Sequence, residues 1–268
     1  MRTIIAALLL CLIGAGSLRA EDKVVIGGSG GLADEMGELA KAYMAKHPGD
    51  KIEVLTETMG TAGGIGAVLA GRVAIGLVTQ TPKGEEKARL VYRVVGRSPV
   101  GVGVHKTLSV NNLAEAQVCD IFTGRIQSWK EVGGNDGKIT VLTRKQNDAN
   151  MEAAREKITC FRDIKFSADA IPLLKGSEVL DALNRRTGTI GIISATFNAA
   201  DRPEVKTLAV GGVAPTPEMV RAGKYKIYNE RGIVTLGAPQ GGAKKFLDFV
   251  AGAEGQKILT RRGLIPSL

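Results

Sequence analysis

Apolar residues along the chain fall into two alternating patterns, short continuous runs and helical repeats. Residues 23–26 and 73–78 are mainly apolar runs of the kind that forms strands buried on both faces of a parallel sheet. Between such runs, apolar residues recur three and four positions apart, as in Ile65, Val68 and Leu69, and this spacing predicts helices. Alternation of strand, loop and helix predicts an α/β fold.

The stretch at residues 92–104 is long, apolar and interrupted by glycine and proline, and we interpret it as a crossover into a second lobe. The alternation then resumes, and the chain is expected to cross back later. We therefore expect two lobes, each with a mixed α/β sheet, and a cleft between them. The expected boundaries place residues 21–98 and 206–268 in lobe 1 and residues 99–205 in lobe 2.

Individual elements follow from the same pattern and from capping signals. Helices should stop at Gly71 and Gly124, because glycine readily adopts left-handed backbone angles, and Ser177 should cap the helix that follows it. Strands are expected at residues 23–26, 52–55, 73–78, 138–142, 189–193, 205–210 and 232–236, and helices at 32–45, 113–124, 150–159, 178–184 and 242–251.

The segment over residues 57–82 combines two features that favour anion binding. A glycine-dense turn at residues 60–64 opens a short helix, and the strand after that helix ends in Thr79, Gln80 and Thr81. Helix N-termini attract anions because their backbone amides are unpaired and carry partial positive charge. Open α/β sheets bind ligands beyond the carboxyl ends of their parallel strands. This segment therefore predicts an anion site.

The first glycine-rich loop, residues 27–31, admits three interpretations. It resembles a dinucleotide-binding fingerprint with Ala33 in place of the third glycine, a weak signal by itself. It also fits the nucleophile-elbow pattern around Ser29, but the chain offers only His47 and His105 as bases, and neither has a supporting motif. The third interpretation is an anion cradle of backbone amides. We favour the cradle, and expect no enzymatic activity and no cofactor, although glycines that only permit a tight turn give the same pattern.

The first twenty residues predict a secretory signal peptide. Arg2 precedes an apolar core at residues 4–13, which is too short to span a membrane, and Ala20 provides a small residue at the expected cleavage site. Cys11 would suggest a lipoprotein, but Leu10 before it is too large for that signal. We therefore expect a soluble, exported protein.

Charge and cysteine content restrict the partners of this exported protein. The formal net charge of +9 includes two arginines of the signal peptide, and a basic surface would steer an anionic ligand towards the protein. Aromatic residues make up only 4% and no basic tract accompanies them, so we expect no nucleic acid partner. Cys119 and Cys160 could form a disulfide or remain two buried thiols, and their spacing fits no zinc site, so no metal is expected.

Four segments together resemble the periplasmic phosphate-binding proteins of ABC importers. Nine residues between 60 and 76 match a pattern of this family, namely Gly60, Gly64, Ile65, Ala67, Leu69, Ala70, Gly71, Val73 and Gly76. Residues 120–129, 212–225 and 246–266 are similar to later family motifs in the same order. The resemblance implies a type II periplasmic binding protein of two lobes, a monomer that delivers a small anion to an ABC permease or a membrane sensor.

The resemblance also implies a set of ligand-binding residues in three loops. The first loop of the family carries serine and threonine where Gly31 and Leu32 stand here, and the aspartate of the second loop is replaced by Thr79. In the third loop the arginine is kept as Arg144. The implied contacts are Ser29, Gly30 and Gly31, then Thr61, Thr79 and Gln80, then Arg144, Asn147, Asp148 and Asn150.

These replacements leave three hypotheses about the ligand open. An arginine clamps carboxylates and phosphates, so Arg144 favours an anion, with phosphate as the family default. Asp148 is expected to cap the next helix and would repel a highly charged ligand, so a small carboxylate or zwitterion, with Asp148 on its amine, is an alternative. A ligand-free interaction protein, with the cleft filled by a side chain such as Leu32, is the third hypothesis.

Overall fold

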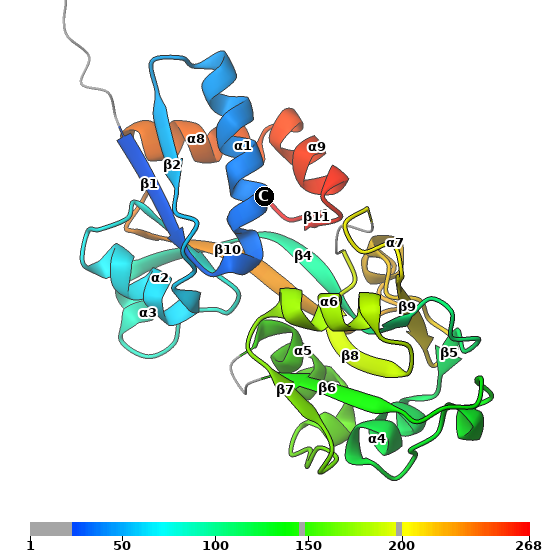
Figure 1. Ribbon diagram of the computed structural model, residues 1–268. Coiled ribbons are helices and arrows are strands. Elements are labelled where there is room, and N and C mark those ends of the chain that lie inside the picture. Colours follow the sequence, from blue (N-terminus) through cyan, green and yellow to red (C-terminus); the bar gives the residue numbers. More distant parts are fainter. Residues whose placement is uncertain (1–22, 145–147, 197–199) are drawn as a thin grey trace, which may run out of the picture.

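A computed structural model describes residues 23–144, 148–196 and 200–268 (Figure 1). Its strands form two mixed sheets that share one long strand, β4 (Leu90–His105). The expected crossover at residues 92–104 is therefore a strand, and β10 (Tyr228–Leu236) runs antiparallel beside its first half. Both strands pass between two groups of helices, which confirms the predicted two-lobed α/β fold.

The first sheet has the strand order β2-β1-β3-β10-β4, with β11 also paired to β4. Its outer three strands are parallel, and β10 is antiparallel to both of its neighbours. Alternate residues of its strands enter different cores, so helices cover both faces. This lobe comprises β1 (Lys23–Gly28), β2 (Lys51–Val54), β3 (Ile75–Val78), β11 (Ile265–Pro266), η1 (Gly30–Leu32), α1 (Ala33–Lys46), α2 (Gly60–Leu69), α3 (Glu86–Arg89), α8 (Gly241–Ala251) and α9 (Ala253–Arg261).

The second sheet continues from the other half of β4 in the order β9-β4-β8-β6-β7, and β5 pairs with β9. Two separate hydrophobic clusters again show that both faces are covered. The elements of this region are β5 (Asn112–Leu113), β6 (Thr140–Arg144), β7 (Ile171–Leu173), β8 (Thr189–Ser194), β9 (Val205–Val210), α4 (Glu115–Thr123), α5 (Ala149–Lys157), α6 (Gly176–Arg185), α7 (Pro217–Arg221), η2 (Trp129–Val132) and η3 (Thr159–Phe161).

Strand pairing bears on where the chain leaves the second lobe. Residues Val205–Val210 of β9 pair with the second half of β4 and with β5, so they lie in the second sheet. The chain re-enters the first sheet at β10, in which Gly232–Val234 pair with β3. The boundary expected between residues 205 and 206 stays a prediction, and the pairing favours a later one.

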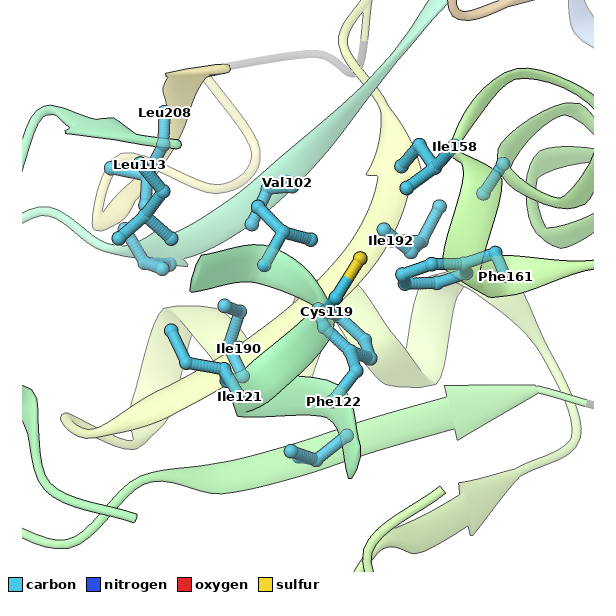
Figure 2. Packing of buried hydrophobic residues seen from close by; sticks show 14 of the residues in the cluster. Val102, Leu113, Cys119, Ile121, Phe122, Ile158, Phe161, Ile190, Ile192 and Leu208 are labelled. Atoms are coloured by element: carbon cyan, nitrogen blue, oxygen red, sulfur yellow. The ribbon is translucent and has the colours of Figure 1, made fainter. Parts of the chain in front are cut away.

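The core of the second lobe contains a disulfide between Cys119 of α4 and Cys160 of η3, with 5.9 Å between their Cα atoms. Figure 2 shows Cys119 among Phe122, Phe161 and Ile158, all buried. The rings of Phe122 and Phe161 meet edge to face with centroids 5.0 Å apart, a favourable arrangement for aromatic pairs. The disulfide joins two segments 41 residues apart in sequence and so fixes η3, which follows α5, against α4.

Two of the three predicted helix ends are confirmed. Gly71 and Gly124 have left-handed backbone angles, with φ of 67° and 80°. The predicted cap at Ser177 is wrong, because α6 begins one residue earlier, at Gly176. The Glu178 carboxylate accepts hydrogen bonds from the amides of Leu174 and Lys175 (2.8 and 3.0 Å), so a glutamate inside the first turn satisfies the amides that we expected the serine to pair.

Candidate functional site

The first loop lies at the end of β1, where Ser29 caps η1. The amide of Gly30 donates to the Thr58 hydroxyl (3.2 Å), and the amide of Gly31 donates a long hydrogen bond to the Ser29 hydroxyl (3.5 Å). Leu32 is fully buried in the core below α1, so the expectation that Leu32 fills the cleft is wrong. Its apolar side chain gains more from the core than from a polar cleft.

The second loop follows β3, and its Thr79 contacts Thr61 in the first turn of α2. The hydroxyl oxygens of Thr61 and Thr79 are 3.0 Å apart, and the Thr79 amide donates to the Thr61 hydroxyl (3.1 Å). The helix can approach so closely because a β-carbon on Gly64 would lie 2.8 Å from the carbonyl oxygen of Leu77 and 2.9 Å from the Cα atom of Gly28. The glycines of this segment therefore serve helix packing, which places Thr61 against Thr79.

The third loop holds Arg144 at the end of β6 and Asp148 at the start of α5. The Nε and Nη2 atoms of Arg144 donate to one oxygen of Asp148 at 3.0 and 2.7 Å, and both side chains are 13% exposed. The other oxygen of Asp148 accepts from the Met151 amide (3.1 Å), so the predicted helix cap is confirmed. Asn147, also predicted to contact the ligand, lies outside the described residues.

Asn150, in the first turn of α5, forms a hydrogen bond to β10. Its side-chain oxygen accepts a 2.6 Å hydrogen bond from the amide group of Asn229 on β10. Asn229 is 6% exposed, and its own side-chain oxygen is buried without a hydrogen-bond partner in the described part of the chain. The first turn of α5 is thereby held against β10, near the middle of the molecule.

Sequence reasoning missed Arg231, which is the most buried charged residue of this region at 8% exposure. A β-carbon built on Gly31 would lie 1.8 Å from Nη1 of Arg231 and 3.5 Å from the Thr79 methyl group. The guanidinium therefore lies directly against the first loop and close to the second. The signal in the sequence was an arginine followed by Gly232 inside an apolar strand, and the β4–β10 register shifts at this pair of residues.

Charges around Arg231 come from both lobes. Burial lowers the pKa of Arg231, while Glu35 of α1 and Asp148 of α5 counteract this effect. Burial raises the pKa of Glu35, and the nearby Arg231 counteracts part of that rise. The pKa of Glu152 is also raised, by burial and then by Asp148. Two arginines and several carboxyl groups thus share one poorly hydrated region, where charges interact more strongly than in water.

A cleft of about 520 Å³ opens beside these groups. It is lined by Thr79 and Gln80 at the end of β3, by Ala149 and Glu152 of α5, and by Tyr228, Asn229 and Glu230 at the start of β10. The structure therefore brings the end of β3 and the start of α5 to one cleft, and Gly31 of the first loop lies close to both Arg231 and Thr79.

Neither histidine lies where it could activate Ser29. His47 stacks on Tyr43 at the end of α1, with ring centroids 4.4 Å apart, and His105 contacts the hydroxyl of Thr107 in the second sheet. No three His, Cys, Asp or Glu side chains gather as a metal site requires, in the residues that the structure describes. No described helix is long and apolar enough to cross a membrane.

Comparison with known proteins places this geometry in a family. The family model described as PBP superfamily domain matches residues 14–254. The phosphate-binding protein PstS of Bacillus subtilis (strain 168) is 27% identical over 261 residues, which cover 94% of this chain and 83% of that protein. PstS of Borreliella burgdorferi is 25% identical over 166 residues, 59% of each chain.

Solved structures agree with these relatives. A crystal structure from Clostridium perfringens, described as a phosphate ABC transporter substrate-binding protein with bound phosphate, superimposes with a TM-score of 0.81 at 29% identity and covers 92% of this chain and 100% of that one. An ABC-type phosphate transport receptor from Vibrio cholerae shares the fold, with a TM-score of 0.70 at 23% identity over 91% of this chain and 100% of that one. The two-lobed fold and the match of the family model over most of the chain show that this protein belongs to the PBP superfamily.

Proposed function

We propose that this protein is a periplasmic solute-binding protein that captures a small oxyanion, phosphate in the first instance, and presents it to an ABC importer. The observation that supports it best is that the end of β3, with Thr79 and Gln80, and the start of α5 line one cleft, and that Arg144 pairs with Asp148 at the start of the same helix. The bound phosphate of the Clostridium perfringens protein, which has a similar fold and sequence, supports the choice of ligand. We infer binding without catalysis.

The mechanism that we propose is closure of the two lobes over the ligand. A ligand that touches Thr79 and Gln80 on one side and the first turn of α5 on the other binds the closed state more tightly than the open one. Closure then shifts with ligand concentration, and a membrane partner can distinguish the loaded form. That partner is an ABC permease or a membrane sensor, and the protein acts as a monomer.

Ten residues are proposed as ligand contacts, as expected from the sequence. The observations favour some of them more than others, because Thr61 and Asp148 already bond within the protein. Thr79, Gln80 and Arg144 are the best placed, the first two on the wall of the cleft and the third beside the start of α5.

A second candidate is a small carboxylate or zwitterion. Arg144 would suit its carboxylate, but Asp148 uses one oxygen for Arg144 and the other for the Met151 amide, which leaves little capacity for an amine. The cleft is nevertheless polar and large enough for several non-hydrogen atoms.

Isothermal titration calorimetry of the mature protein, dialysed free of phosphate, tests the proposal. Phosphate is expected to bind with a dissociation constant below about 0.1 mM, and acetate and a set of amino acids are expected to bind far more weakly. An Arg144→Gln variant should lose at least tenfold in affinity. Absence of heat and of a thermal shift at about 1 mM phosphate would refute phosphate binding, and binding of an amino acid instead would favour the second candidate.

A further inference from the structure

Arg231 is a buried cation that has no paired anion among the described residues. It is 8% exposed, and its Nε atom is buried with no hydrogen-bond partner among the described residues. No ion pair or hydrogen bond links its guanidinium to any residue that the structure describes, whereas Arg144 is paired with Asp148. Burying a charge without a partner is costly, so a group of this kind usually serves a ligand or a charge change.

The carboxylates nearest to Arg231 do not neutralise it by contact. Glu35 and Asp148 are close enough to affect its pKa, but neither forms an ion pair with it. Asp148 is committed to Arg144 and to the Met151 amide. The guanidinium therefore keeps unused donors in a region where water cannot easily replace a missing acceptor.

Arg231 lies at a place from which its guanidinium could bind a ligand. The guanidinium lies against Gly31 and near Thr79, where the first and second loops meet. A guanidinium offers up to five N–H donors, and charge-assisted hydrogen bonds to oxyanions are about twice as strong as neutral ones.

We propose that Arg231 is a ligand-binding residue, and that the cleft holds an oxyanion with two negative charges between Arg231 of the first lobe and Arg144 of the second. This inference rests on the proposed function and specifies its ligand class. One guanidinium from each lobe makes the closed form depend on the ligand, because an anion between them can bond to both lobes only when they are close together. Dianionic phosphate and sulfate fit this arrangement, and a monoanionic carboxylate satisfies it only in part.

Arg231→Met is the variant that separates a ligand-binding role from a structural one. Methionine is similar in length and apolar, so it removes an unpaired buried charge without leaving a large cavity. If Arg231 serves the ligand, the ligand-free variant should unfold at the same temperature as the wild type or higher, and its affinity for phosphate should fall at least tenfold. Arg93→Met is the matched control, because Arg93 is an exposed arginine on the neighbouring strand β4, and this change should leave phosphate affinity unaltered.

Gly31→Ala tests the same role while the arginine remains. An alanine β-carbon would be 1.8 Å from Nη1, so the guanidinium must move away from the loop. Phosphate affinity should again fall several-fold, whereas affinity for acetate should change little.

Calorimetry with phosphate, sulfate and acetate, together with thermal unfolding of the ligand-free proteins, decides the matter. Wild-type affinity for phosphate in Arg231→Met, or a lower unfolding temperature of this variant without ligand, would overturn the inference and assign Arg231 to the fold. If the wild type itself binds neither phosphate nor sulfate, the proposed function fails, and the inference fails with it. If the wild type binds phosphate and Arg231→Met binds it with the same affinity, the proposed function stands and this inference alone is lost.

Discussion

The buried pair of Arg144 and Asp148 allows one prediction to be worked out in detail. The change is Asp148→Asn, which removes the negative charge but keeps an oxygen that can cap α5. Asp148 binds Arg144 through two nitrogens, at 3.0 and 2.7 Å, with both side chains 13% exposed. The variant therefore leaves the Arg144 guanidinium in a poorly hydrated place without its anion.

The magnitude follows from distance and burial. At 2.7 Å and an effective dielectric constant of about 20, the Coulomb attraction is about 6 kcal/mol, of which desolvation of the two groups cancels a large part. Removing one partner of a buried pair costs about 3–5 kcal/mol. Asparagine has one side-chain oxygen, so if it keeps the cap it turns an NH2 group, which cannot accept a hydrogen bond, towards Arg144. We therefore expect a loss of at least about 3 kcal/mol, which lowers the unfolding midpoint by about 6 °C or more in a protein of this size.

The surface pair of Lys138 and Asp169 provides a matched control. Its nitrogen and oxygen are 2.9 Å apart, but the side chains are 66% and 71% exposed. Exposed pairs of this kind contribute about 0–1 kcal/mol, so Asp169→Asn should shift the midpoint by no more than about 3 °C. Thermal unfolding followed by circular dichroism measures both variants under the same conditions. Equal shifts for Asp148→Asn and Asp169→Asn would show that burial does not strengthen the first pair and would refute the reasoning.

Three further predictions follow from other groups. Thr79→Asp should improve the preference for phosphate over sulfate in competitive calorimetry, because a carboxylate accepts the proton of hydrogen phosphate and repels sulfate; an unchanged ratio would place Thr79 away from the ligand. Reduction of the disulfide between Cys119 and Cys160 should cost about 2–4 kcal/mol in urea unfolding, because the bond closes a long loop in the unfolded chain, and a cost near zero would contradict this. Burial raises the pKa of Glu35, so the folded protein holds this proton more tightly than the unfolded chain; stability should fall as pH rises from about 4.5 through the raised value, and Glu35→Gln should flatten that part of the curve.

The order of strands and helices was predictable because it depends on local periodicity. The runs at residues 23–26 and 73–78 became β1 and β3, which lie next to each other as parallel strands. The long stretch at residues 92–104 became β4, a strand shared by two sheets, although glycine and proline interrupt its apolar pattern. Short elements such as β7 were missed, because three residues carry too little periodicity to be recognised.

The candidate site was only partly predictable, because the position of one of its residues depends on the register in which β10 pairs with its neighbouring strands. Thr79, Asp148 and Asn150 lie at the ends of regular elements, and such ends can be located from periodicity and capping signals. Arg231 lies in the middle of a strand, and its approach to Gly31 depends on how β10 pairs with β3 and β4. An irregularity between Arg231 and Gly232 interrupts the pairing with β4, and nothing in the local sequence determines which side chain it directs towards the first loop.

Gly31 and Arg231 depend on each other sterically, although they are far apart in the sequence. A residue with a β-carbon at position 31 would collide with the guanidinium, so a hydroxyl residue there and the buried arginine cannot occupy the same space. Hydroxyl groups and amides meet a negative charge with dipoles, whereas Arg231 meets it with a full positive charge. Counting lost hydroxyl groups in the first loop therefore underestimates how strongly the cleft can attract an anion, because the compensating group comes from a strand far away in the sequence.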